Sequence, residues 1–243
     1  MNIPKLPRLP NAYDLIISCL SLLVIINGYF LNSLHLAIAS AVASVAIAVI
    51  AEIIIEYIKT RKIIFSKSPV VSGLIIASIV QIGSFDKIAM AAILAMILKK
   101  LIKKEEMPIF NPAAPGLFIT FLFNQGLGEV WWANGTGATM LATLVLGLIV
   151  SWRIKKLYIS FSYLLVFLLL NFLHPAFDLA FLPLFSAFFM ITEPKTTPNE
   201  RNHQLIFGAF ASIIIHVFGL LALPSSFLLG ILVSNLAGKI FLK

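Results

Sequence analysis

Apolar runs long enough to cross a lipid bilayer follow one another along nearly the whole chain. A membrane-spanning helix needs about 20 residues, and fewer where protein or long basic side chains cover its ends. Of the 243 residues, 60% are hydrophobic and 12% are charged, whereas about a quarter of the residues in a soluble domain are charged. A single water-facing core cannot bury so much apolar surface. The sequence therefore predicts an all-α integral membrane protein that crosses the bilayer many times.

Ten candidate transmembrane helices can be delimited between short polar or basic segments. They cover residues 13–31, 36–57, 70–83, 88–102, 113–123, 140–152, 157–173, 177–192, 205–223 and 225–242. The third and fourth are short, and the fourth ends in Lys99 and Lys100, whose side chains can snorkel to the membrane surface. The whole chain, 1–243, is predicted to form a single membrane domain.

The basic residues fall almost entirely on one side of this arrangement. With the N-terminus placed in the cytoplasm, 17 of the 18 Lys and Arg residues are cytoplasmic, and only Lys87 lies outside. Cytoplasmic loops of membrane proteins carry such an excess, and one miscounted span would exchange the sides of every later loop. We therefore expect a multi-pass protein of the cell (inner) membrane with both termini cytoplasmic. The net charge of +8 belongs to these flanks, so no nucleic-acid partner is expected.

The chain divides into two halves of five spans each, 1–123 and 124–243. An odd number of spans gives the two halves opposite orientations, which is an inverted repeat. At an offset of 114 residues, Pro69-Val70-Val71-Ser72-Gly73 corresponds to Pro183-Leu184-Phe185-Ser186-Ala187. Short segments marked by proline at equivalent places in two halves often indicate a binding site at the membrane midplane. Their small residues are also explained by close helix packing, and both interpretations stay open.

Polar residues gather in two segments that begin helices. Asn111 and Pro112 precede the fifth span, where they can cap its start or help to line a covered cavity. The segment Asn134-Gly135-Thr136-Gly137-Ala138-Thr139 precedes the sixth span. Its small residues would leave the hydroxyls of Thr136 and Thr139 accessible, although a glycine-rich turn that caps a helix explains the pattern equally well.

Acidic residues mark two further places. Glu193 lies in the segment Thr192-Glu193-Pro194-Lys195, at the cytoplasmic end of the eighth span, where it can pair with Lys195 or simply belong to a turn. Glu52 and Glu56 are one helical turn apart on the second span, either at the aqueous rim or deeper, where acidic groups are usually functional. The four histidines and the single cysteine have no metal-ligand spacing, so neither a metal site nor catalytic residues are predicted.

Four of these motifs, in this order, resemble those of one family of membrane redox proteins. They are the stretch Ser68-Pro69-Val70-Val71-Ser72-Gly73-Leu74, the motif Phe110-Asn111-Pro112-Ala113, the motif Thr136-Gly137-Ala138-Thr139 and the motif Thr192-Glu193-Pro194. The family includes RnfD of the Rnf electron-transport complex and NqrB of the sodium-translocating NADH:quinone reductase. The resemblance covers most of the chain. The predicted fold, two inverted halves of five spans each, is also similar to that of the family. One departure is Ala133, where the family usually has Asp.

The resemblance implies a redox function. Family members carry FMN through a phosphoester to the threonine that corresponds to Thr139, attached on the extracytoplasmic side by a flavin transferase that uses FAD. The implied cofactor-binding residues are Thr139, Thr136, Gly137, Ala138, Asn111 and Glu193. The protein would then be one subunit among other membrane redox subunits and not a complete enzyme. The alternative is a transporter or channel-like carrier for a small solute, which an inverted repeat also suits. A bound flavin would distinguish the two.

Overall fold

The computed structural model describes residues 11–104, 107–124, 130–172 and 182–242. In these residues the chain forms a helical bundle with one short hairpin, Lys103–Lys104 (β1) paired antiparallel with Met107–Pro108 (β2). The helices of the first half are α1 (Ala12–Phe30), α2 (Leu34–Thr60), α3 (Ser68–Ile79), α4 (Phe85–Leu101) and α5 (Ala113–Phe123). Those of the second half are η1 (Trp132–Asn134), α6 (Ala138–Arg153), α7 (Leu157–Asn171), η3 (Ser186–Met190), α8 (Arg201–Leu220) and α9 (Ser226–Phe241).

The all-α prediction is confirmed, and each predicted span coincides with a helix or a helical segment. Among the described residues, three helices, α1, α2 and α8, are long and apolar enough to cross a membrane by themselves, and five shorter apolar helices accompany them. The start of the predicted eighth span, 177–181, and residue 173 lie outside the described residues. The described part of that span contains η3, a π-helical turn of 5 residues.

The third span is shorter than predicted because another segment takes over the hydrogen bonds at its end. Helix α3 ends at Ile79, whose carbonyl accepts hydrogen bonds from the main-chain N–H groups of Val130 and Trp131, both at 3.2 Å. The indole N–H of Trp132 donates to the carbonyls of Ala77 and Val80 at 2.7 and 3.1 Å. Carbonyls at a helix end need such partners where no water reaches them. Because residues 130–132 supply these partners, α3 can end at Ile79.

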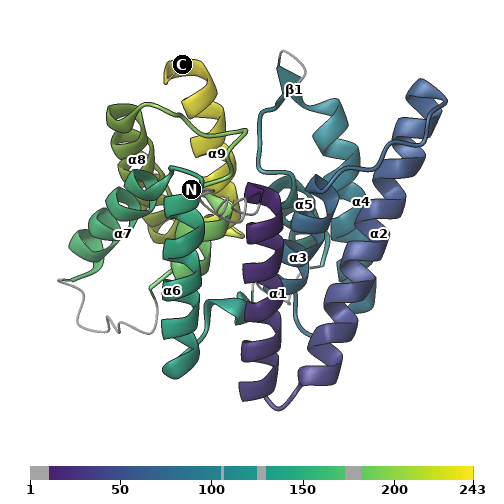
Figure 1. Cartoon of the computed structure of the whole chain (residues 1–243). Helices are drawn as coiled ribbons and strands as arrows, with labels where there is room; N and C mark the ends of the chain where they lie inside the picture. The colour runs from purple at the N-terminus through teal and green to yellow at the C-terminus, as the bar shows by residue number, and fades with distance from the viewer. Residues whose placement is uncertain (1–10, 105–106, 125–129, 173–181, 243) are drawn as a thin grey trace, which may run out of the picture.

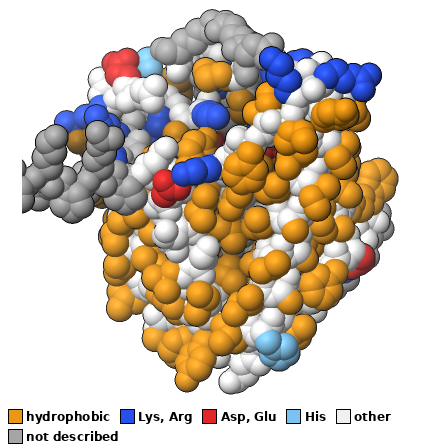
Figure 2. Space-filling view, turned by 45° about the vertical axis from the view of Figure 1, so that its right-hand side comes forward, with side chains coloured by type: hydrophobic (Ala, Val, Ile, Leu, Met, Phe, Trp, Pro, Cys, Tyr) orange, Lys and Arg blue, Asp and Glu red, His pale blue; other side chains and the backbone are white. Residues whose placement is uncertain are grey.

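The lateral surface of the bundle is apolar, as a membrane protein requires. Large hydrophobic side chains stand exposed on several helices, for example Ile58 on α2 (69%), Phe161 on α7 (60%) and Phe123 on α5 (76%). Figure 2 shows hydrophobic side chains over most of the visible face, with Lys and Arg gathered toward one end. We call this the basic end. Helices α2 and α9 finish on this side of the molecule, whereas α6 begins on the opposite side (Figure 1).

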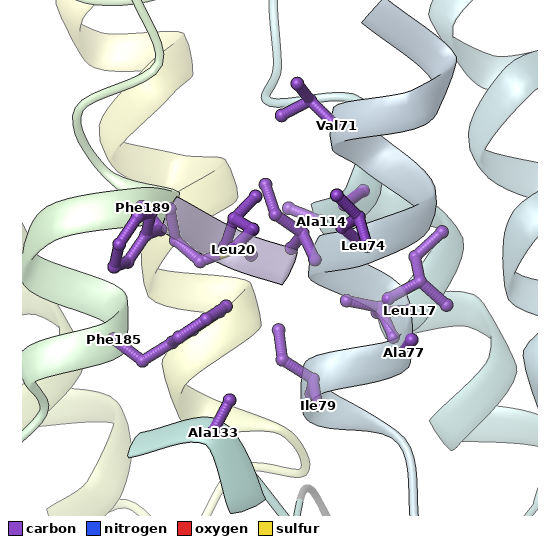
Figure 3. Close-up of a cluster of buried hydrophobic side chains, with 14 of the residues drawn as sticks. Leu20, Val71, Leu74, Ala77, Ile79, Ala114, Leu117, Ala133, Phe185 and Phe189 are labelled. Carbon is purple, nitrogen blue, oxygen red and sulfur yellow. The ribbon is translucent and has the colours of Figure 1, made fainter. Parts of the chain in front are cut away.

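The core lies between the two halves. Leu20 of α1, Leu74 of α3, Leu117 of α5 and Phe185 belong to one cluster of buried hydrophobic side chains (Figure 3). Small residues bring the helices close together. A Cβ atom added at Gly116 of α5 would lie 2.4 Å from the carbonyl oxygen of Ala91 on α4, so any larger side chain would push these two helices apart.

Corresponding contacts recur in the two halves. The Ser44 hydroxyl of α2 donates to the carbonyl of Gly73 at 2.7 Å, and the Ser160 hydroxyl of α7 donates to the carbonyl of Ala187, also at 2.7 Å. Gly73 and Ala187 occupy equivalent positions at the offset of 114 residues. Helix α2 packs on α4 as α7 packs on α8. Each half therefore has a serine–carbonyl contact of this kind, although the two serine donors are 116 positions apart and only the acceptor residues match at the offset of 114.

Candidate functional site

The segment that leads into α6 folds into a tight turn around the Thr139 hydroxyl. Gly135 and Gly137 have positive φ angles of 78° and 56°, which L side chains rarely adopt. A Cβ atom at Gly135 would also lie 2.7 Å from Thr139 Oγ1. The Thr139 hydroxyl accepts the Thr136 N–H at 2.8 Å and donates to the Thr136 carbonyl at 2.9 Å. The predicted glycine-rich turn before the helix is therefore present, with Gly137 as the N-cap residue of α6 and no side-chain capping hydrogen bond.

The two threonines of this turn differ in exposure. Thr136, Gly137 and Ala138 are exposed, whereas Thr139 is 5% exposed. The prediction that both hydroxyls are accessible is correct for Thr136 and wrong for Thr139. The reason is local, because the turn folds the Thr139 hydroxyl back onto the main chain of Thr136.

Thr136 and Thr139 line a pocket of about 760 Å³. We call it the motif pocket. Its lining includes residues at the start of α6, and α6 begins on the side of the molecule opposite to the basic end (Figure 1). Its walls combine aromatic rings with a few polar side chains, which is typical of a site for a small organic ligand. The remaining lining residues are Asn27, Phe30, Leu31, Val130, Trp131, Trp132, Asn134, Gly135, Pro183, Ser186 and Phe227.

Asn134 holds two walls of the motif pocket together. Its side-chain amide donates to the carbonyl of Leu182 at 2.8 Å, and its side-chain oxygen accepts the N–H of Phe185 at 2.9 Å. The Trp131 ring packs against Phe185 and Phe227, with ring centroids 6.2 and 5.9 Å apart. Sequence reasoning treated Asn134 as part of a turn and missed Trp131 and Phe227, because these residues meet only in the folded chain.

Ala133 is fully buried, and Figure 3 shows it beside Phe185 and Ile79 in the apolar cluster. An aspartate here would place a carboxylate among hydrophobic side chains, where it would be costly without a partner. The carbonyl of Ala133 accepts the Thr143 hydroxyl at 3.0 Å. Alanine therefore fits the packing of this chain at the position where the family usually has an acid.

Asn111 is buried and does not line the motif pocket. Its side-chain oxygen accepts the N–H of Ala113 at 3.1 Å, which is the predicted cap of α5. Its side-chain amide donates to the carbonyl of Met190 at 2.9 Å, in η3. A π-helical turn displaces main-chain carbonyls from their regular partners. Side chains satisfy them here, because Ser160 donates to Ala187 and Thr192 to Phe188.

Glu193 lies apart from the motif pocket as well. It is 9% exposed, and burial raises the pKa of its carboxyl, although Lys195, Lys99 and Lys156 act in the opposite direction. The predicted pairing of Glu193 with Lys195 is not seen, since no ion pair joins these two described residues. Lys195 instead lies over the ring of Tyr13, 5.7 Å from its centroid.

Lys156, just before α7, is 2% exposed and holds the segment that follows Glu193. Its ammonium donates to the carbonyls of Thr197 and Pro198 at 3.1 and 2.7 Å and to the Asn199 side chain at 2.8 Å. Burial lowers the pKa of Lys156 to about 8, against the opposing effect of Glu193.

Glu52 and Glu56 pair with the lysines at the end of α4. Lys99 contacts Glu52 at 2.8 Å, with both side chains at most 10% exposed. Lys100 contacts Glu56 and also lies 3.5 Å from Glu52. Lys99 and Lys100 therefore turn inward to these carboxylates instead of snorkelling. Glu52 is buried at the basic end, and its partners come from α4 and not from the basic residues that follow α2.

The fold and the pocket define a helical integral membrane protein with a ligand-sized pocket where α6 begins and a basic face at the other end. Among the described residues no group of three or more His, Cys, Asp or Glu side chains could hold a metal ion. The chain belongs to the NQR2, RnfD, RnfE family, whose model matches residues 85–241. It is therefore a membrane subunit of the Rnf and Nqr type of electron-transport complex and assembles with other membrane subunits. No curated protein matches the sequence.

Proposed function

We propose that this protein carries FMN on Thr139 and passes electrons through it as one subunit of a membrane redox complex. The observation that supports this most directly is that the Thr139 side chain lines a ligand-sized pocket with aromatic walls. Thr139 is also the last residue of the motif that carries the resemblance, and the family match covers that motif. The flavin ring would supply the redox chemistry, and the protein would position it and set its surroundings.

The position of Thr139 in its helix suits a phosphate ester. Thr139 is the second residue of α6, a helix of 16 residues. The first N–H groups of a helix have no partners within the helix, and the helix dipole favours negative charge at this end. A phosphate attached to the Thr139 oxygen would lie near these N–H groups. The exposed Thr136 hydroxyl stands outside the helix and lacks this arrangement.

The lining of the pocket supports a flavin ring as the ligand. Trp131 and Phe227 provide aromatic surface, and a planar ring packs favourably against such side chains. The buried Ser186 hydroxyl in the pocket wall has no hydrogen-bond partner among the described residues. A native protein rarely leaves a buried hydroxyl unpaired, and a functional role or a bound group is a common explanation. A ligand with hydrogen-bonding atoms along one edge would pair it.

Attachment needs a change in the turn. The transferase would join the Thr139 oxygen to the phosphorus of the FMN moiety of FAD, with AMP leaving and the hydroxyl proton going to a base of the transferase. Before this, the Thr139 hydroxyl must leave the Thr136 carbonyl, at a net cost of about 1 kcal/mol for one hydrogen bond. The two glycines of the turn give the main chain the freedom to open.

The proposal also includes two inverted halves of five spans each and an orientation that places the motif pocket on the extracytoplasmic side of the membrane. The recurring serine–carbonyl contacts of α2 and α7 support two structurally equivalent halves. The gathering of Lys and Arg at the end away from the motif pocket supports an extracytoplasmic flavin.

The test is covalent flavin on protein produced together with its flavin transferase. We expect in-gel flavin fluorescence after denaturation and an intact mass raised by one FMN less one water. Thr139→Val should remove both signals, and Thr136→Val is the matched control that should keep them. If the wild type carries no added mass beside an active transferase, the attachment is wrong and a carrier function gains support. If only Thr136→Val loses the flavin, the attachment site is wrong.

A further inference from the structure

The Ser186 hydroxyl is the most unusual polar group of the motif pocket. The residue is 1% exposed, it lines the pocket, and its hydroxyl makes no hydrogen bond within the described part of the chain. A buried hydroxyl without a partner destabilises a protein. A hydrogen bond from this hydroxyl to a bound ligand would explain why it has no partner within the protein.

The equivalent residue of the first half shows what Ser186 lacks. Ser72 lies 114 positions earlier, and its hydroxyl donates to the carbonyl of Ser68, four residues back, at 3.2 Å. This is the ordinary way in which a helix satisfies a buried serine. The first half therefore leaves no serine hydroxyl free at this position.

In the second half this local acceptor is occupied. The carbonyl four residues before Ser186 is that of Leu182, and it accepts the N–H of Leu184 at 2.8 Å and the Asn134 side-chain amide at 2.8 Å. A carbonyl oxygen has two lone pairs, so both are in use. The hydrogen bond from Asn134 thus leaves the Ser186 hydroxyl without its usual helical acceptor, in a residue that lines the pocket.

We propose that the Ser186 hydroxyl donates a hydrogen bond to one of the carbonyl oxygens, the acceptor atoms on the edge of the flavin ring held in the motif pocket. This inference rests on the proposed attachment of FMN at Thr139. Reduction adds electron density to these acceptor atoms, so the hydrogen bond stabilises the reduced flavin more than the oxidised one. Ser186 then raises the reduction potential of the flavin.

The experiment compares wild-type protein with Ser186→Ala, Ser186→Thr and Ser72→Ala, each produced with the flavin transferase. Covalent flavin is measured by in-gel fluorescence and intact mass, and the midpoint potential and absorption spectrum by spectroelectrochemistry. We expect full flavin attachment in all four proteins. Ser186→Ala should lower the ratio of reduced to oxidised flavin at fixed potential about tenfold, which is about 30 mV for a two-electron couple. Ser186→Thr keeps the hydroxyl and should restore the wild-type value, and Ser72→Ala should not change it.

The outcomes separate the two proposals. If Ser186→Ala carries flavin with the potential and spectrum of the wild type, the role of Ser186 is wrong and the attachment at Thr139 stands. If the wild type carries no flavin, both are wrong. If Ser72→Ala shifts the potential as much as Ser186→Ala, the effect is a general consequence of losing a serine, which also overturns the inference. Ser186→Ala removes an unpaired hydroxyl, so its thermal stability should equal or exceed that of the wild type.

Discussion

The Asn111 side-chain amide donates to the main-chain carbonyl of Met190 at 2.9 Å, and this bond joins residues 79 positions apart. It connects the start of α5 in the first half with η3 in the second half. Asn111 belongs to a motif that the sequence places at a helix start, and in the structure its side chain makes two different hydrogen bonds. It caps its own helix and satisfies a carbonyl of the π-helical turn.

The first prediction concerns this bond. Asn111→Ala should lower the free energy of unfolding by about 1–3 kcal/mol, because the carbonyl of Met190 stays buried without its partner. Unfolding in detergent, followed by circular dichroism, measures the change. Asn202→Ala, at an exposed position of α8, is the control and should change the stability little. Equal stability of the two variants would contradict the prediction.

A second prediction concerns the ion pair between Glu52 and Lys99, whose side chains are 7% and 10% exposed. Lys99→Met should destabilise the protein by about 3 kcal/mol, since it leaves a buried carboxylate short of one partner. The double variant Glu52→Gln with Lys99→Met should recover part of this loss, because it removes both charges. Lys67→Met breaks the exposed pair with Asp14 and should cost less than about 1 kcal/mol. Strict additivity of the two single changes in the double variant would show that the pair is not coupled.

The third prediction follows from Lys156, whose pKa is lowered to about 8 by burial. An unfolded chain restores the ordinary lysine pKa of about 10.4, so it binds more protons than the folded protein between these two values. The contribution of Lys156 to the free energy of unfolding therefore rises with pH across this window. Denaturant unfolding of wild type and Lys156→Met at several pH values measures this. The stability of the wild type relative to the variant should increase from about pH 8 to about pH 10, and a constant difference would show that the pKa of Lys156 is not lowered.

A fourth prediction tests the orientation. Single cysteines at Lys104 and Glu200, in a Cys19→Ala background, should react with a membrane-impermeant maleimide only from the cytoplasmic side. A cysteine at Gln81, exposed between α3 and α4, should react only from outside. Labelling of all three positions in intact cells without permeabilisation would contradict the arrangement of ten spans with cytoplasmic termini. Cys19 is buried, so its replacement by alanine removes background reactivity at little cost.

Much of the fold could be predicted because hydropathy and charge act locally along a membrane helix. An apolar run such as 36–57 has to become a helix in lipid, since no other local structure satisfies its main-chain groups. Lys99 and Lys100 were correctly placed at the end of the fourth span, but hydropathy could not show that they turn inward to Glu52 and Glu56. The early end of α3 depends on Trp132, which comes 53 positions after Ile79.

The sequence by itself determined the class of the protein, the positions of its helices, the basic end and the motif that contains Thr139, because each depends on residues that are neighbours in the chain. Only the tertiary structure decided that Thr139 is buried in a pocket wall, that Asn27, Trp131 and Phe227 meet there, and that Asn111 and Glu193 lie elsewhere. The free hydroxyl of Ser186 also appears only in the fold. It exists because Asn134, which is distant in sequence, donates to the Leu182 carbonyl that a helical serine would otherwise use. A local sequence pattern cannot show that two distant residues compete for one acceptor.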